Sequence, residues 1–154
     1  MDASGADDTR EDLTEQDAFV NVARCLHALL PAGATSVSCS TSRTVALGSR
    51  QIIAVMEDGT EQSVRGDREL SDAIGELRQS MYRDGAGTWF SARFTVTADG
   101  KVDASCNYDD EPGWDFPPDP QIYATDLQAF PRDDARVPEW LRQKVRDHEA
   151  GKTE

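Results

Sequence analysis

The chain has 154 residues, of which 38% are hydrophobic and 29% charged, a composition typical of one soluble globular domain. Its 29 acidic residues outnumber 16 basic ones and give a net charge of -13. Because nucleic acids and anionic membranes bind through basic surfaces, this charge argues against direct binding to either. It suits a basic protein partner, since opposite fields speed encounter, although an acidic surface also serves simple solubility.

Residues 1–13 are small, polar and acidic, and we expect a disordered acidic tail. This start is the reverse of the basic and apolar start of a signal peptide, and no apolar run reaches the length of a membrane span. Three scattered cysteines (Cys25, Cys39 and Cys106) form no C-x-x-C pair and fit buried free thiols in a reducing compartment. These features predict a cytoplasmic protein.

A first helix is predicted from Thr14, which can cap it, to a stop at Pro31-Ala32-Gly33. Glu15 and Asp17 in its first turn suit the positive end of the helix dipole. Apolar residues recur at helical spacing and form one stripe: Phe19, Val22, Ala23, Leu26, Leu29 and Leu30.

Strands are predicted in the segment that follows. Residues 35–47 alternate loosely between apolar and Ser/Thr positions and indicate one or two half-buried strands. Residues 51–57 are apolar on both faces and are the best candidate for a central strand. Asp58-Gly59 predicts a hairpin turn that leads into a more polar strand over residues 60–65.

A second helix is predicted over residues 66–82, with an exit turn at residues 84–87. Its apolar residues fall on one stripe: Leu70, Ile74, Leu77 and Met81. Two alternating strands follow, over residues 89–97 and 101–108.

The turn between these two strands follows from their alternation. A two-residue loop would place Val96 opposite Asp103 and mix core with solvent. A three-residue loop, Ala98-Asp99-Gly100, instead pairs Val96 with Val102 and Phe90 with Tyr108. We therefore predict a type I turn followed by a bulge with Gly100 in the left-handed region.

Residues 122–130 predict a short helix stopped by Pro131, and Pro138 suits the first turn of a last helix. The order of elements predicts one α+β domain over residues 14–149 and a frayed C-terminus over 150–154. Its single antiparallel-dominated sheet is packed by an N-terminal helix, a middle helix and C-terminal helices.

The loop between the last strand and these helices is acidic and rigid. From Asp109 to Asp119 it holds five carboxylates and no Lys or Arg, and its prolines exclude helix and inner-strand conformations. We predict a partner-binding surface made of Asp109, Asp110, Glu111, Trp114, Asp115, Phe116 and Asp119. In the alternative interpretation, the two aromatic residues fold back onto the core and the carboxylates are only solvated.

Signatures of catalysis are missing from the sequence. His27 lies beside the apolar stripe of the first helix and His148 near the end of the last one, so a hydrolase triad or a zinc site is hard to assemble from them. There is no phosphate-binding or nucleophile motif. Read as a calcium loop from Asn107, the acidic segment has Pro112 where the invariant Gly belongs and Pro118 where the bidentate Glu belongs. We expect no catalytic residue, cofactor or metal, and a carboxylate-based metal-binding enzyme is the least favoured alternative.

Four pieces of sequence resemble a known family when taken as a set. They are Trp89-Phe90, Asn107-Tyr108-Asp109-Asp110-Glu111-Pro112, Asp126-x-x-x-Phe130-Pro131-Arg132, and Pro138-x-Trp140-Leu141. Over about residues 87–142 the chain resembles the YezG-type antitoxin or immunity-protein family of bacterial polymorphic toxin systems.

The resemblance implies a protein that binds and neutralises a cognate toxin without catalysis or cofactor. A basic nuclease domain is one candidate toxin, since the acidic loop could occupy its phosphate-binding groove as a phosphate mimic. The alternative is a non-catalytic adaptor domain that binds another basic protein. The sequence leaves open the identity of the toxin and the oligomeric state.

Overall fold

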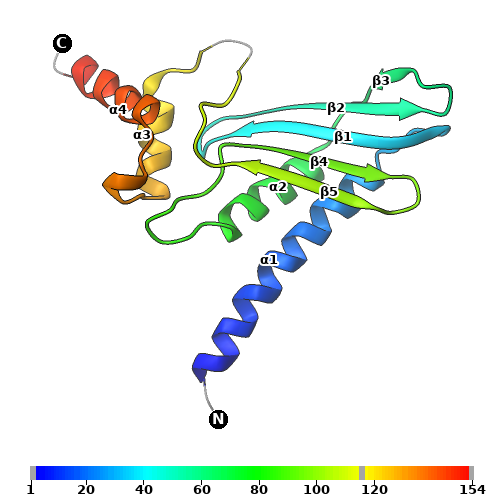
Figure 1. The fold of residues 1–154 in the computed structure, drawn as a ribbon, viewed down its shortest axis with the longest axis horizontal. Coiled ribbons are helices and arrows are strands. Elements are labelled where there is room, and N and C mark those ends of the chain that lie inside the picture. Colours follow the sequence, from blue (N-terminus) through cyan, green and yellow to red (C-terminus); the bar gives the residue numbers. More distant parts are fainter. Residues whose placement is uncertain (1–2, 115–116, 153–154) are drawn as a thin grey trace. The chain divides into compact units, whose positions relative to one another are not determined.

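The computed structural model describes residues 3–114 and 117–152, and within these it contains four α-helices and a single five-stranded antiparallel sheet (Figure 1). The strand order is β3-β2-β1-β4-β5. The elements are α1 (Ala3–His27), β1 (Ala34–Arg43), β2 (Gly48–Met56), β3 (Glu61–Ser63), α2 (Arg68–Ser80), β4 (Ser91–Thr97), β5 (Val102–Asn107), α3 (Pro120–Ala129), the 3-10 turn η1 (Asp134–Arg136) and α4 (Glu139–Lys152). The predicted α+β class, with its N-terminal, middle and C-terminal helices, is confirmed.

The contacts within the chain group its residues into two compact units. The first unit consists of the described residues up to Cys39, Gln51–Met81 and Phe94–Ala104. The second unit consists of Ser40–Arg50, Tyr82–Arg93 and the described residues from 105 onward. Both units take residues from the same strands. The single domain over residues 14–149 stays a prediction.

The first unit packs α1 and α2 side by side against one face of its part of the sheet (Figure 1). Asp67 caps α2 by accepting the Leu70 N–H at 2.9 Å, and Arg24 of α1 pairs with Glu69 of α2 at 3.1 Å. The predicted buried stripe of α2 is confirmed at Leu70, Ile74 and Leu77. The other buried apolar residues of this unit are Ala18, Val22, Cys25, Leu26, Val37, Cys39, Ile52, Ala54, Ala73, Phe94 and Val96.

The helix bounds differ from the predicted ones at both ends of the chain. α1 continues back to Ala3, so the predicted helix start at Thr14 is wrong. Once a helix is nucleated, each residue added to its end gains one hydrogen bond. The helix can therefore continue beyond its apolar stripe. α4 likewise continues to Lys152, past the predicted end of the domain at residue 149.

The middle strand of the five is β1, flanked by β2 and β4. β2 lies between β1 and β3, so the segment predicted as a central strand, residues 51–57, does form most of an inner strand. β1 is rich in Ser and Thr, yet its hydroxyls find partners on neighbouring strands. Ser38 Oγ lies 2.9 Å from Thr95 Oγ1, and Thr41 Oγ1 donates to the Ser49 carbonyl at 2.8 Å. Because buried hydroxyls with partners cost little, a polar strand can lie at the centre of a sheet.

The β4–β5 hairpin has the predicted three-residue loop. Gly100 has φ 93°, and the Thr97 N–H donates to Lys101 O at 2.9 Å, which sets Val96 opposite Val102. At the other end the predicted pairing of Phe90 with Tyr108 is wrong, because the Phe90 N–H donates to Asn107 O at 2.8 Å.

The second unit is centred on an aromatic cluster. Phe90, Tyr123 and Leu141 are buried together, with Trp140 packed against them. The Trp140 ring meets the Phe90 ring edge-on at 5.2 Å between centroids and the Tyr123 ring at 5.3 Å. These edge-to-face contacts join the residue before β4 to α3 and α4. Among the described residues, no helix is both long and apolar enough to cross a membrane.

Candidate protein-binding surface

A buried arginine holds the start of the acidic segment. The Arg132 side chain is only 2% exposed and donates to the carbonyl oxygens of Tyr108 (2.6 Å), Thr88 (3.1 Å) and Arg136 (3.2 Å). Its guanidinium also lies 3.4 Å from the Asp109 carboxylate. A buried cation is tolerated when its N–H groups have hydrogen-bond acceptors in this way. Because the guanidinium is planar and rigid, it then fixes the positions of the groups that accept from it.

A glycine turn makes room for this arginine. Gly87 has φ 78°, and a Cβ at this position would overlap Arg132 Nε and lie 2.8 Å from its Cγ. The predicted exit turn over residues 84–87 is therefore required by the packing of Arg132, which comes from a distant part of the chain.

The backbone at Asp109 and Asp110 is held by side chains of other residues. Asn107 Oδ1 accepts the Asp110 N–H and its Nδ2 donates to the Asp110 carbonyl, both at 2.9 Å. The Trp140 indole N–H donates to Asp109 O at 2.7 Å. Both carboxylates nevertheless face solvent, and the Asp109 side chain is 81% exposed. The Asn107 side chain thus shapes the turn, because its amide oxygen and nitrogen are both hydrogen-bonded to the backbone of Asp110.

The rest of the acidic segment is anchored at several further points. The Glu111 carboxylate is 47% exposed and lies 3.9 Å from Lys144 Nζ of α4. Pro112 is buried, and Gly113 O accepts a hydrogen bond from Ser42 Oγ at 3.2 Å. Residues 109–114 are therefore held against their own unit by these contacts.

Trp114 is half-buried, and its indole N–H donates to the Tyr123 hydroxyl at 2.8 Å. Burial raises the pKa of Tyr123, this hydrogen bond lowers it, and the charges of Glu111 and Asp126 raise it further. Trp114 therefore braces α3 through its polar edge, whereas the sequence predicted it as a partner contact. A brace can also take part in an interface, so its role in binding stays a prediction.

The remaining predicted site residues fall into two groups. Asp119 is exposed and is the N-cap of α3, with Oδ1 accepting the Gln121 N–H at 2.9 Å. Asp115 and Phe116 lie outside the described residues. The structure thus brings Asp109, Asp110 and Glu111 together as exposed carboxylates, and gives Trp114 and Asp119 local structural contacts.

Sequence reasoning missed the cations of this surface. The acidic segment contains none of its own, but the fold brings Arg132 and Lys144 to Asp109 and Glu111. Arg132 follows Phe130-Pro131 in one of the family-like motifs, which was the only signal for it. Its burial depends on contacts that no local pattern reports.

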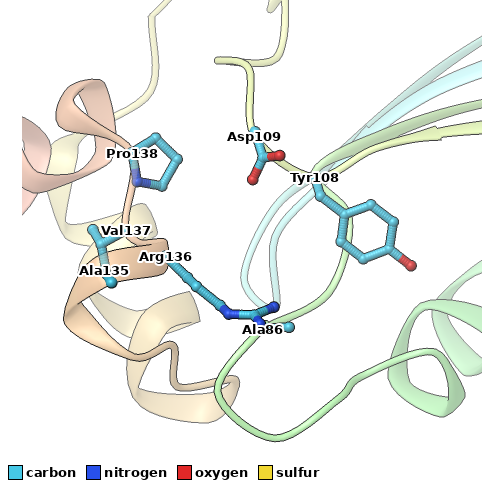
Figure 2. Close-up of a pocket in the computed structure, with 7 residues that line it drawn as sticks. All are labelled: Ala86, Tyr108, Asp109, Ala135, Arg136, Val137 and Pro138. Atoms are coloured by element: carbon cyan, nitrogen blue, oxygen red, sulfur yellow. The ribbon is translucent and has the colours of Figure 1, made fainter.

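An open hollow of about 560 Å³ adjoins Asp109. Its other lining residues come from the glycine turn, the end of β5 and the segment that leads into α4: Ala86, Tyr108, Ala135, Arg136, Val137 and Pro138. Figure 2 shows the Arg136 side chain extending from η1 toward Ala86. Charges of both signs therefore lie at this end of the surface.

The described part of the chain holds no group of three His, Cys, Asp or Glu side chains that could bind a metal ion. His27 lies on the first unit, with Nε2 3.3 Å from Ala98 O. Comparison of the chain with protein-family models and with curated proteins found no match.

Proposed function

We propose that this chain is a cytoplasmic immunity protein, which binds a cognate bacterial toxin and blocks it through Asp109, Asp110 and Glu111. One observation carries the proposal. Three consecutive carboxylates are exposed while the backbone that bears them is held by buried or partly buried side chains. A protein that needs only solubility has no reason to hold its acidic residues in one geometry.

Preorganisation is the physical benefit of this arrangement. A flexible acidic loop would lose conformational entropy on binding, whereas a segment already fixed by Arg132, Asn107 and Trp140 loses little. Exposed carboxylates on a chain of net charge -13 also attract a basic partner over a distance. A nuclease domain has the required basic groove, because it must bind phosphates. The resemblance to YezG-type immunity proteins agrees with this proposal and does not test it.

The test is co-expression of this chain with the toxin domain encoded beside its gene, followed through growth rescue and the Kd of the purified complex. The site variant combines Asp109→Asn, Asp110→Asn and Glu111→Gln. A control variant combines Glu57→Gln, Glu61→Gln and Asp103→Asn, which removes the same charge from exposed positions of the first unit.

We expect the site variant to raise Kd by about tenfold or more and to reduce the dependence of Kd on salt, since close charge pairs are lost. The control should change Kd by less than about threefold, through long-range attraction alone. Equal effects of the two variants would show that net charge, and not this surface, governs binding. Binding without growth rescue would favour the adaptor alternative.

A further inference from the structure

Exposed apolar side chains are few on the described part of the chain, and two of them share one turn. Among the residues whose side chains the structure describes, 15–114 and 117–151, the large ones are Val20 (62% exposed), Val45 (52%), Leu47 (37%) and Val102 (40%). Val45 and Leu47 flank Ala46, also exposed, in the turn between β1 and β2. Such turns are normally built from Gly, Asn, Asp and Pro, so three consecutive apolar residues here are unusual.

This turn is held in one conformation. The Thr44 N–H donates to Leu47 O at 2.7 Å, and Thr44 Oγ1 accepts from the N–H groups of Leu47 (3.0 Å) and Ala46 (3.3 Å). The Val45 N–H donates to the carboxylate of Asp126 at 2.7 Å. Asp126 is 3% exposed and belongs to α3, so the second unit uses a buried carboxylate to fix an exposed apolar turn. A buried carboxylate is costly unless it is hydrogen-bonded in this way.

The same helix connects the turn to the acidic segment. Tyr123 lies on α3 three residues before Asp126, and its hydroxyl accepts the hydrogen bond from Trp114. Ser42, at the β1 end of the turn, donates to Gly113 O. The apolar turn and the acidic segment are therefore braced by shared partners within one unit.

We propose that Val45 and Leu47 form an apolar contact of the toxin-binding surface and insert into an apolar recess beside the basic groove that receives Asp109, Asp110 and Glu111. This inference rests on the proposed function. Protein interfaces commonly combine a desolvated apolar contact with a charged rim, and rigid apolar side chains lose little entropy when they are buried. Because Asp109, Asp110 and Glu111 lie in the same unit, the protein that binds the apolar turn should be basic.

The chain offers a matched control for this proposal. The turn variant combines Val45→Ser and Leu47→Ser, and the control combines Val20→Ser and Val102→Ser, which changes two apolar side chains of similar exposure in the first unit. All four side chains are exposed, so both variants should fold, which circular dichroism checks. If the serine pair disturbs the turn, Val45→Ala with Leu47→Ala replaces it.

The measurement is the Kd for the co-expressed toxin domain at low and high salt. We expect the turn variant to raise Kd by about tenfold or more at both salt concentrations, because the lost contact is apolar, and the control to leave Kd within about twofold. A turn variant that binds as well as the control would overturn the inference and leave the proposed function standing. Failure of the wild-type chain to bind at all would overturn both. A wild-type dimer in light scattering that the turn variant converts to monomer would assign the turn to a second copy and overturn the inference.

Discussion

Substitution of Gly87 by alanine tests whether Arg132 organises the second unit. The new Cβ would occupy a left-handed backbone position, φ 78°, and would overlap the Arg132 side chain. Arg132 cannot move without leaving the carbonyls of Thr88, Tyr108 and Arg136, to which it donates. The substitution therefore combines backbone strain with displacement of a buried cation.

The two contributions can be separated in magnitude. A left-handed conformation costs an alanine roughly 1–2 kcal/mol. Removing the partners of a buried charge costs about 3–5 kcal/mol, and partial relaxation of the guanidinium should reduce this to about 2–4 kcal/mol. We therefore expect Gly87→Ala to lower the free energy of unfolding by about 3–6 kcal/mol in total.

Two other glycines provide controls with the same backbone strain. Gly100 has φ 93° and nothing within 4 Å of an added Cβ, so Gly100→Ala isolates the cost of the backbone conformation. Gly85 has φ 77°, and its Cβ would overlap the carboxylate of Asp133, which is exposed and can rotate away. Urea unfolding followed by far-ultraviolet circular dichroism measures all three variants. If Gly87→Ala costs no more than Gly100→Ala, Arg132 is not the rigid anchor described above.

Three further predictions concern side chains around the acidic segment. Trp114→Phe loses the hydrogen bond to Tyr123 and should lower the free energy of unfolding by about 1 kcal/mol, whereas an unchanged Tm with weaker toxin binding would make Trp114 a partner contact alone. Asp119→Ala removes the N-cap of α3 and should cost about 1 kcal/mol in urea unfolding, most of which Asp119→Ser should restore. Burial raises the pKa of Tyr123 above its ordinary value of 10.0, so the stability it contributes is complete below about pH 10 and is lost as pH rises through the folded-state pKa. Tm measured from about pH 9 to 11 should fall less steeply for Tyr123→Phe than for the wild type, and an identical fall would contradict this account.

Elements whose pattern is local were predicted well. The stripe of α2 recurs every three or four residues, and the β4–β5 turn follows from alternation on either side of Gly100. The order of the strands in the sheet was left open by the sequence, and β1 is the middle strand despite its Ser and Thr residues. A hydropathy pattern predicts which apolar side chains are buried. It carries no information on a Ser or Thr hydroxyl that is buried because it forms a hydrogen bond to a neighbouring strand.

The sequence by itself determined the α+β class, and it determined the acidic character and the high proline content of the segment from Asp109 to Asp119, since these are properties of neighbouring residues. Only the tertiary structure decided which of these carboxylates stay exposed, which residues hold them, and that Trp114 is bonded to Tyr123. Arg132 lies more than twenty residues from Asp109 in the chain and reaches it only when the segment after α3 lies beside the residues that follow β5. Contacts of this kind depend on the path of the backbone through space, which no local periodicity encodes.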